Sequence, residues 1–231
     1  MTRMFQTKIC GITSVEDALA ARDSGVEAIG LNFYPPSPRS IASELAAEIS
    51  RALAEPATSR SPQIVGVFVN EPLESLLLIA KQAGLDYLQL HGDETPEYLQ
   101  SLQQQTSLPL IKAFRWGKEG PAETEAFLKA CQAKNIKLAA ILIDAREEQA
   151  YGGTGKVADW SAVRSFKSEH PDLLVILAGG LKPENVARAI EQTGADAVDT
   201  ASGVESSPGK KSPEKMRQFV AAAQFPFMKE P

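Results

Sequence analysis

Short apolar runs alternate with stretches of helical spacing along the chain, and this alternation limits the possible folds more than any other feature. Eight runs have the length of a β-strand, at residues 7–10, 28–33, 64–69, 87–90, 110–114, 138–144, 174–178 and 197–200. Several, such as IVGVFV and LAAILI, are apolar throughout, which is typical of strands buried on both faces of a parallel sheet. The segments between them carry helix start signals such as the Thr-Pro-Glu at 95–97.

Eight strand–helix units within 231 residues predict a single α/β domain, a (β/α)8 barrel, at roughly 29 residues a unit. A doubly wound open sheet is the alternative, because it also alternates strands and helices. The barrel is favoured because an open sheet seldom needs eight such regular units. We expect one domain over residues 1–231, with residues 224–231 as a frayed tail.

Composition restricts the kind of partner. The net charge of −5 argues against broad binding of nucleic acid, and the apolar runs are too short for a membrane span. With an N-terminus that lacks a signal sequence, the chain is expected in the cytoplasm. Two cysteines, Cys10 and Cys131, form no disulfide framework, and two histidines, His91 and His170, argue against a histidine metal site. No metal or cofactor is expected, and Cys131, His170 and Trp160 are interpreted as structural.

Two strand ends carry candidate acid–base groups, since the active site of such barrels lies at the carboxyl ends of the strands. Cys10 ends the first strand, and its thiol needs a lowered pKa to act as a base at neutral pH. Asp144 ends the sixth strand and suits a general acid. The alternative for Cys10 is a buried small apolar residue, and the alternative for Asp144 is a cap of the following loop. Lys8 is expected to point away from Cys10 and is given no role.

Three further residues are candidates for substrate binding. Asp199 ends the last strand, where it either orients a substrate hydroxyl or serves as a structural carboxylate. His91 ends the LQLH run and either lines the site or only bonds a neighbouring loop. Arg39 follows three prolines in the 34–40 loop, and its guanidinium suits a planar carboxylate; an exposed surface arginine is the alternative.

Glycine-rich loops follow the last three strands and suggest an anion site. The candidates are Gly152, Gly153 and Gly155 after the sixth strand, Gly179 and Gly180 after the seventh, and Ser202 and Gly203 after the eighth. Glycine allows successive backbone N–H groups to surround an anion. Because the loops after strands seven and eight are the usual phosphate site of this fold, we predict a small phosphorylated substrate.

Eight motifs resemble one known family from the first strand to the last. They are KICGI at 8–12, GLNFYPPSPRS at 30–40, GVFVN at 66–70, LQLHGDE at 88–94, LIDA at 142–145, YGGTGK at 151–156, LAGGLKPENV at 177–186 and VDTASGVE at 198–205. Together, and in this order, they are similar to those of the phosphoribosylanthranilate isomerases of tryptophan biosynthesis.

The resemblance implies a cofactor-free Amadori rearrangement of N-(5-phosphoribosyl)anthranilate to an aminated 1-deoxyribulose 5-phosphate. It implies Asp144 as the acid, Cys10 as the base, Arg39 as the partner of the anthranilate carboxylate, and the glycine loops as the phosphate site. Two departures stand out. Ala201 replaces a serine that is usual before Ser202, and Ser40 replaces a common aromatic residue.

Two other functions remain open at this point. A related histidine-pathway isomerase works with two carboxylates, and Cys10 in place of the first favours the tryptophan pathway. A barrel that binds a phosphorylated ligand without catalysis is the second alternative, and the presence of both Cys10 and Asp144 argues against it. We expect a monomer in preference to a homodimer, with a small phosphorylated molecule as its partner and neither nucleic acid nor membrane.

Overall fold

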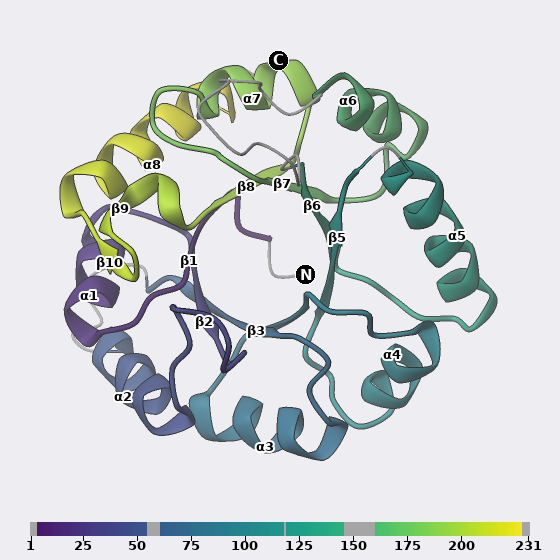
Figure 1. Cartoon of the computed structure of the whole chain (residues 1–231), viewed down its shortest axis with the longest axis horizontal. Helices are drawn as coiled ribbons and strands as arrows, with labels where there is room; N and C mark the ends of the chain where they lie inside the picture. The colour runs from purple at the N-terminus through teal and green to yellow at the C-terminus, as the bar shows by residue number, and fades with distance from the viewer. Residues whose placement is uncertain (1–3, 55–60, 118, 146–159, 228–231) are drawn as a thin grey trace.

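Eight parallel strands form a closed barrel with helices around it (Figure 1). The computed structural model describes residues 4–54, 61–117, 119–145 and 160–227. The strands are β1 (Thr7–Cys10), β2 (Ala28–Asn32), β3 (Gln63–Phe68), β4 (Tyr87–Leu90), β5 (Leu110–Arg115), β6 (Ala140–Asp144), β7 (Val175–Ala178) and β8 (Ala197–Thr200). β8 pairs with β1, so the sheet has no open edge. This closure confirms the predicted barrel and excludes the doubly wound alternative.

The outer ring of helices follows the strands in chain order. It consists of α1 (Val15–Asp23), α2 (Ser43–Ala54), α3 (Leu73–Ala83), α4 (Pro96–Gln103), α5 (Gly120–Ala133), α6 (Trp160–Glu169), α7 (Val186–Thr193) and α8 (Pro213–Phe227). After β8 the chain adds a short 3-10 helix, η1 (Ser202–Val204), and a hairpin of β9 (Glu205–Ser207) and β10 (Lys210–Lys211). Within the described residues, no helix is long and apolar enough to span a membrane.

Local sequence explains where several helices begin and end. Ser14 accepts a hydrogen bond from the Asp17 N–H at the start of α1, and Thr95 accepts one from Tyr98 at the start of α4. Gly84 adopts the left-handed conformation that ends α3, with φ of 63°, which glycine reaches without steric cost. These ends set the loops that return the chain to the sheet.

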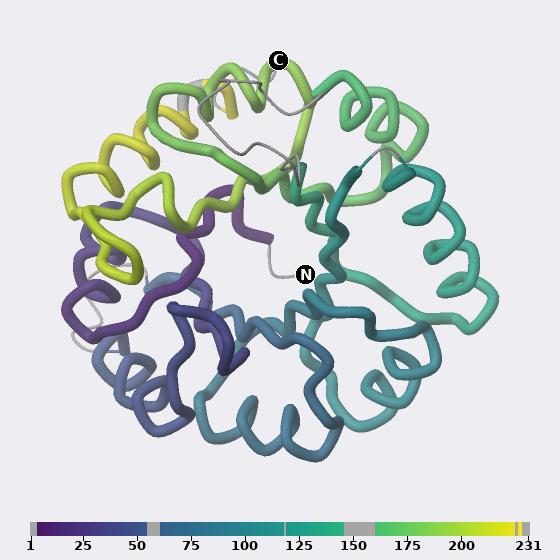
Figure 2. The backbone as a smooth tube through the Cα atoms, viewed as in Figure 1, coloured from purple at the N-terminus to yellow at the C-terminus, as the bar shows by residue number. Residues whose placement is uncertain are grey.

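The apolar side chains form two layers on either side of the sheet. The larger lies between strands and helices, and the smaller fills the barrel interior with residues such as Val65, Ile111 and Ile176. Phe5 belongs to the inner layer and packs edge-on against Tyr87, with ring centroids 5.6 Å apart. Figure 2 shows the chain running from the barrel centre into β1. One end of the barrel is therefore filled, and the strands' carboxyl ends are left to form a site.

The C-terminal helix corrects one expectation. Residues 224–227 were expected to fray, yet α8 continues to Phe227. Phe227 packs against the core, and Pro226 is buried. Contacts of these apolar residues hold the last turn in place. Residues 228–231 lie outside the described residues.

Candidate active site

A cavity of about 120 Å³ lies at the carboxyl ends of the strands. Strand alternation decides which side chains reach it, because residues two apart on a strand share a face. The predicted site residues that line it are Cys10, His91, Asp144, Gly179, Gly180, Asp199 and Ser202. The barrel therefore brings together residues that are far apart in the sequence. Gly152, Gly153 and Gly155 lie outside the described residues.

Cys10 lies at the end of β1, directly opposite Gly30 on β2. Burial raises the pKa of its thiol, and the nearby Lys8 and Lys211 ammonium groups oppose that rise. The opposition is incomplete, so the pKa of Cys10 stays above its ordinary value. The sequence placed this thiol at the barrel mouth but did not identify the charges around it.

The prediction that Lys8 points away from Cys10 is wrong. The two residues are two positions apart on β1, so their side chains leave the strand on the same face. Lys8 is completely buried, and its Nζ lies 3.0 Å from Asp199 Oδ1. Burial alone would lower the pKa of Lys8, but Asp199 and Cys10 outweigh it and raise the pKa. Lys8 is thus a charged neighbour of the candidate base.

Asp144 and Asp199 approach the cavity from β6 and β8. Asp144 is half-buried, and the backbone N–H of Trp116 donates to its carbonyl oxygen at 2.9 Å. Burial raises the pKa of Asp199, while Lys8 opposes this and Asp144 adds to it. Because β7 and β8 separate β6 from β1, Asp144 and Cys10 occupy different walls of one cavity. A molecule between them can lose a proton to one group and gain a proton from the other.

The loops after β7 and β8 meet at the same wall. Gly179 and Gly180 have φ angles of 98° and 65°, a region that favours glycine. A Cβ at Gly203 would lie 1.9 Å from the Leu181 carbonyl oxygen, so only glycine allows the two loops to pack this closely. Thr200 Oγ1 donates to that same oxygen at 2.7 Å. Gly203 therefore shapes the wall, while Gly179, Gly180 and Ser202 line the cavity itself.

Arg39 reaches the rim of the barrel over Gly11. A Cβ at Gly11 would lie 2.4 Å from Arg39 Cδ, so the arginine stem occupies the space that glycine leaves. Its Nε and Nη2 donate to the two carboxylate oxygens of Glu205 at 2.6 and 2.8 Å. This pairing holds the guanidinium at a fixed angle.

Glu205 also holds Lys211, whose Nζ lies 3.0 Å from Glu205 Oε1. Burial alone would raise the pKa of Glu205, but Arg39 and Lys211 outweigh it and lower the pKa. Neither Glu205 nor Lys211 was singled out from the sequence, because both come from the unpredicted β9–β10 hairpin. The Arg-carboxylate-Lys network is therefore a structural finding.

Gln89 and His91 contribute polar atoms from β4. The Gln89 side-chain amide nitrogen lies 3.0 Å from His91 Nδ1. Gln89 Oε1 is buried and has no hydrogen-bond partner within the described part of the chain. A buried acceptor of this kind needs a donor, and Gln89 lines the cavity. Sequence reasoning missed Gln89 because a polar residue in the LQL run gave no sign of facing inward.

A second cavity of about 370 Å³ lies beside the first, lined by residues of the β4–α4 and β5–α5 segments. Lys112, on the outer face of β5, reaches it, but its Nζ already donates to the Gly92 carbonyl at 2.7 Å and to Glu94 at 3.0 Å. His91 is the predicted site residue that borders both cavities. The acid–base pair therefore belongs to the smaller cavity.

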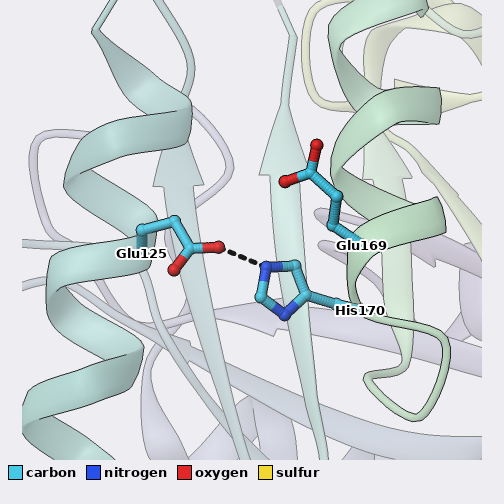
Figure 3. Close-up of side chains that lie close together, drawn as sticks. All are labelled: Glu125, Glu169 and His170. Atoms are coloured by element: carbon cyan, nitrogen blue, oxygen red, sulfur yellow. Dashed lines mark hydrogen bonds and ion pairs between the residues drawn. The ribbon is translucent and has the colours of Figure 1, made fainter.

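His170 lies away from the barrel mouth, in a cluster between α5 and α6 (Figure 3). Its Nε2 pairs with Glu125, and Glu169 brings a third ligand-type atom, all within 4.8 Å of one another. The imidazole ring also packs on Phe166, with ring centroids 4.4 Å apart. The pair with Glu125 links the end of α6 to α5, which agrees with the structural role predicted for His170.

Comparison with known proteins agrees with this geometry. Residues 7–222 match the family model described as N-(5'phosphoribosyl)anthranilate (PRA) isomerase. The chain belongs to the phosphoribosylanthranilate isomerase family. The family relationship covers every barrel strand.

Curated relatives are identical to this chain at about four residues in ten. The N-(5'-phosphoribosyl)anthranilate isomerase of Thermotoga neapolitana is 44% identical over 95% of this chain and 98% of its own length. That of Rubrobacter xylanophilus is 42% identical over 95% of this chain and 99% of its own length. The match therefore extends over nearly the full length of this chain and of each relative.

Solved structures of the family superimpose on the barrel. The phosphoribosylanthranilate isomerase of Thermotoga maritima has a TM-score of 0.80 and 38% identity, covering 96% of this chain and 99% of its own. Another family structure contains reduced 1-(o-carboxyphenylamino)-1-deoxyribulose 5-phosphate, with a TM-score of 0.77, 35% identity and coverage of 96% and 99%. A further structure describes monomers derived from the dimeric Thermotoga maritima enzyme, with a TM-score of 0.77, 34% identity and coverage of 96% and 100%.

Proposed function

We propose that this chain converts N-(5'-phosphoribosyl)anthranilate into 1-(2-carboxyphenylamino)-1-deoxyribulose 5-phosphate, a step of tryptophan biosynthesis. One observation carries the assignment to this site: Cys10 and Asp144 face a single cavity whose wall is the β7 and β8 glycine loops. A thiol, a carboxyl group and an anion-binding wall are what an acid–base isomerase of a sugar phosphate requires. The reaction needs no cofactor.

The first step opens the ribose ring. Asp144, as a carboxylic acid, donates its proton to the ring oxygen while the bond from that oxygen to C1 breaks. The anthranilate nitrogen supplies its lone pair to C1, so a protonated Schiff base forms and Asp144 becomes a carboxylate. The position of Asp144 at the end of β6, facing the cavity, supports its role as the donor.

The second step removes the proton from C2. Cys10, as a thiolate, takes this proton, and the electrons of the C2–H bond form a C1–C2 double bond. The iminium nitrogen is neutralised at the same time, which gives an enolamine. Loss of the proton on the C2 oxygen and gain of one at C1 then yield the ketone. A base on β1 and an acid on β6 suit two transfers at different atoms.

The remaining groups bind the two ends of the substrate. Backbone N–H groups of the Gly179–Gly180 and Ser202–Gly203 loops bind the phosphate, and Arg39 binds the anthranilate carboxylate. Asp199 and His91 border the ribose, and the buried Gln89 Oε1 accepts a hydrogen bond from a ribose hydroxyl. That acceptor lines the cavity without a partner among the described residues, which supports a role in binding a donor there.

An assay with two aminoaldose substrates tests the proposal. The purified chain is incubated separately with N-(5'-phosphoribosyl)anthranilate and with the histidine-pathway aminoaldose. NMR then follows the loss of the anomeric proton and the appearance of a C1 methylene beside a ketone. We expect turnover of the anthranilate compound. Turnover of only the histidine-pathway compound, or of neither, contradicts the proposal.

Quaternary structure and cell compartment belong to the same proposal. We expect a monomer, because few large apolar side chains of the described chain are exposed. They are Tyr34, Leu78 and Leu174, which belong to three separate segments: the β2–α2 loop, α3 and the segment before β7. We also place the chain in the cytoplasm, where a reducing environment keeps Cys10 a free thiol.

A further inference from the structure

A buried ion pair inside the barrel has no part in the two proton transfers. Lys8 and Asp199 lie opposite each other on β1 and β8, with both side chains almost entirely removed from solvent. Burying two charges is unfavourable unless their surroundings compensate for lost hydration. A pair retained at the edge of a catalytic cavity therefore calls for an explanation other than stability.

The position of Gly30 shows what the pair faces. Gly30 lies opposite Cys10 on the neighbouring strand β2. A Cβ at this glycine would lie 2.7 Å from Cys10 Sγ and 3.1 Å from Lys8 Nζ. The thiol and the ammonium therefore meet in the space that the missing side chain leaves. The ammonium therefore acts on the sulfur as a nearby positive charge, which favours the thiolate over the neutral thiol.

We propose that Lys8 is a positioning residue for the isomerase reaction: its buried ammonium, held by Asp199 beside Gly30, stabilises the thiolate form of Cys10. The inference rests on the proposed function for its catalytic meaning. Its physical content is a property of the free protein, so it can be tested without substrate.

The groups around Cys10 set the expected direction. Burial raises the pKa of the thiol, and Lys8 is the strongest opposing influence. The negative charge of Asp199 raises the pKa of Cys10, but the same charge keeps Lys8 protonated although burial disfavours its charged form. Among the residues that the structure describes, the charged and titratable groups that face Cys10 or its cavity are Lys8, Arg39, His91, Asp144, Asp199 and Lys211. Removing Lys8 takes away the nearest cation and so raises the pKa of Cys10 further.

The experiment measures how fast iodoacetamide alkylates Cys10 as a function of pH. The background variant is Cys131→Ala, which leaves a single thiol, since the chain has only two cysteines. Mass spectrometry follows the modification, and circular dichroism verifies the fold of every variant. Lys8→Met keeps the length of the buried stem and removes the charge, and Lys8→Arg serves as the charge-retaining control.

Lys8→Met is expected to move the midpoint of the alkylation profile upward by about one to three pH units, and Lys8→Arg by less. The double variant Lys8→Met/Asp199→Asn removes both charges and avoids an unpaired buried carboxylate. It is expected to show a smaller upward shift than Lys8→Met, because it also removes the negative charge of Asp199, which raises the pKa of Cys10. This double variant decides the matter where the single variant fails to fold. An unchanged midpoint in a folded Lys8→Met or double variant overturns the proposal.

A measurement on the unsubstituted lysine adds a test that no unfolded variant can block. With 15Nζ-labelled lysine, NMR measures the chemical shift of the buried Lys8 ammonium as a function of pH. This shift is expected to change with the same midpoint as the alkylation of Cys10, because both report ionisation of the thiol. The change is expected to vanish in Cys10→Ser. Absence of such a transition contradicts the proposal. The two proposals can fail separately. If the protein shows the transition but does not turn over the anthranilate substrate, the interaction between Lys8 and Cys10 stands and the proposed function is wrong.

Discussion

At the scale of single residues, the site is a set of strand-end side chains whose chemistry depends on their neighbours. Burial favours the neutral thiol of Cys10 over the thiolate that can act as a base, and so raises the pKa of this thiol. The positive charges of Lys8 and Lys211 counteract this rise in the pKa of Cys10. Arg39 is similarly dependent, since Glu205 holds its guanidinium at the rim. Function at this site therefore requires pairs of residues.

Substitution of the acid or the base tests the assigned chemistry. Cys10→Ser and Asp144→Asn are each expected to lower kcat by about 10²-fold or more, as loss of a general acid or base does. Steady-state kinetics measures the change, with circular dichroism to verify the fold. Cys131→Ala, in the buried face of α5, is the matched control and is expected to leave kcat unchanged. Near-full activity of either site variant refutes its role.

The Arg39–Glu205 pair gives a second test at this scale. Arg39→Ala is expected to raise KM about ten- to a hundredfold with a smaller change in kcat, because a charged hydrogen bond to the substrate carboxylate is lost in ground and transition states alike. Glu205→Gln is expected to raise KM by less, since the guanidinium remains but is no longer fixed. An unchanged KM in Arg39→Ala removes this residue from the site.

Sequence reasoning at this scale identified strand-end residues and missed their partners. Cys10, Asp144, His91 and Asp199 were found because they close apolar runs. The direction of the Lys8 side chain was predicted wrongly, since residues two positions apart on a strand point to the same face. Gly30, Glu205 and Lys211 act through contacts with residues distant in the chain, and no local pattern indicates such contacts.

At the scale of elements, the period of the apolar runs is sufficient to place the strands. β1, β4 and β8 have the predicted bounds. β6 begins at Ala140, two residues later than predicted. The apolar run already starts at Leu138, two residues before the chain joins the sheet. The β9–β10 hairpin was not predicted, since its polar ESS and KK segments carry no alternation. Gly179 and Gly180, in the loop after β7, line the cavity, and their binding of a phosphate stays a prediction.

The outer face of β5 contributes a stability prediction. Lys112 and Glu94 form a buried ion pair, and Glu94 also accepts the backbone N–H of Asn70 at 2.8 Å. Lys112→Met leaves a buried carboxylate without its cation. It is expected to lower the free energy of unfolding by about 3–5 kcal/mol, measured by urea denaturation.

The exposed pair Lys134–Glu97 supplies the control for this experiment. Lys134→Met removes a cation of the same type from solvent, where ion pairs contribute little, and is expected to leave the urea midpoint almost unchanged. Equal effects of the two lysine substitutions would show that the buried pair contributes no more than a surface one.

At the scale of the whole molecule, the closed barrel accounts for most of the sequence. The inner core, with Phe5 at one end, leaves the opposite end as the place where side chains face an open cavity. This division between a filled end and a functional end was predictable, because it follows from the fold class. The size of the cavity and the charges in it were not predictable, since they depend on packing across eight strands.

The oligomeric state is tested on the intact chain. Light scattering after size-exclusion chromatography is expected to give the monomer mass of 24.8 kDa, because an obligate dimer needs a large contiguous apolar surface. A mass twice this value at micromolar concentration contradicts the prediction. Leu78 on α3, 66% exposed, is then the first position to substitute with a polar residue.

The contact between Lys8 and Asp199 joins residues 191 positions apart in the chain. Before β8 has docked against β1, a growing or refolding chain holds Cys10 with no fixed ion pair beside it. The surroundings of the Cys10 thiol are therefore completed by the same event that closes the barrel. Its alkylation rate during refolding is expected to change at that event, because the thiol is buried and gains a neighbouring ammonium group only when the first and last strands meet.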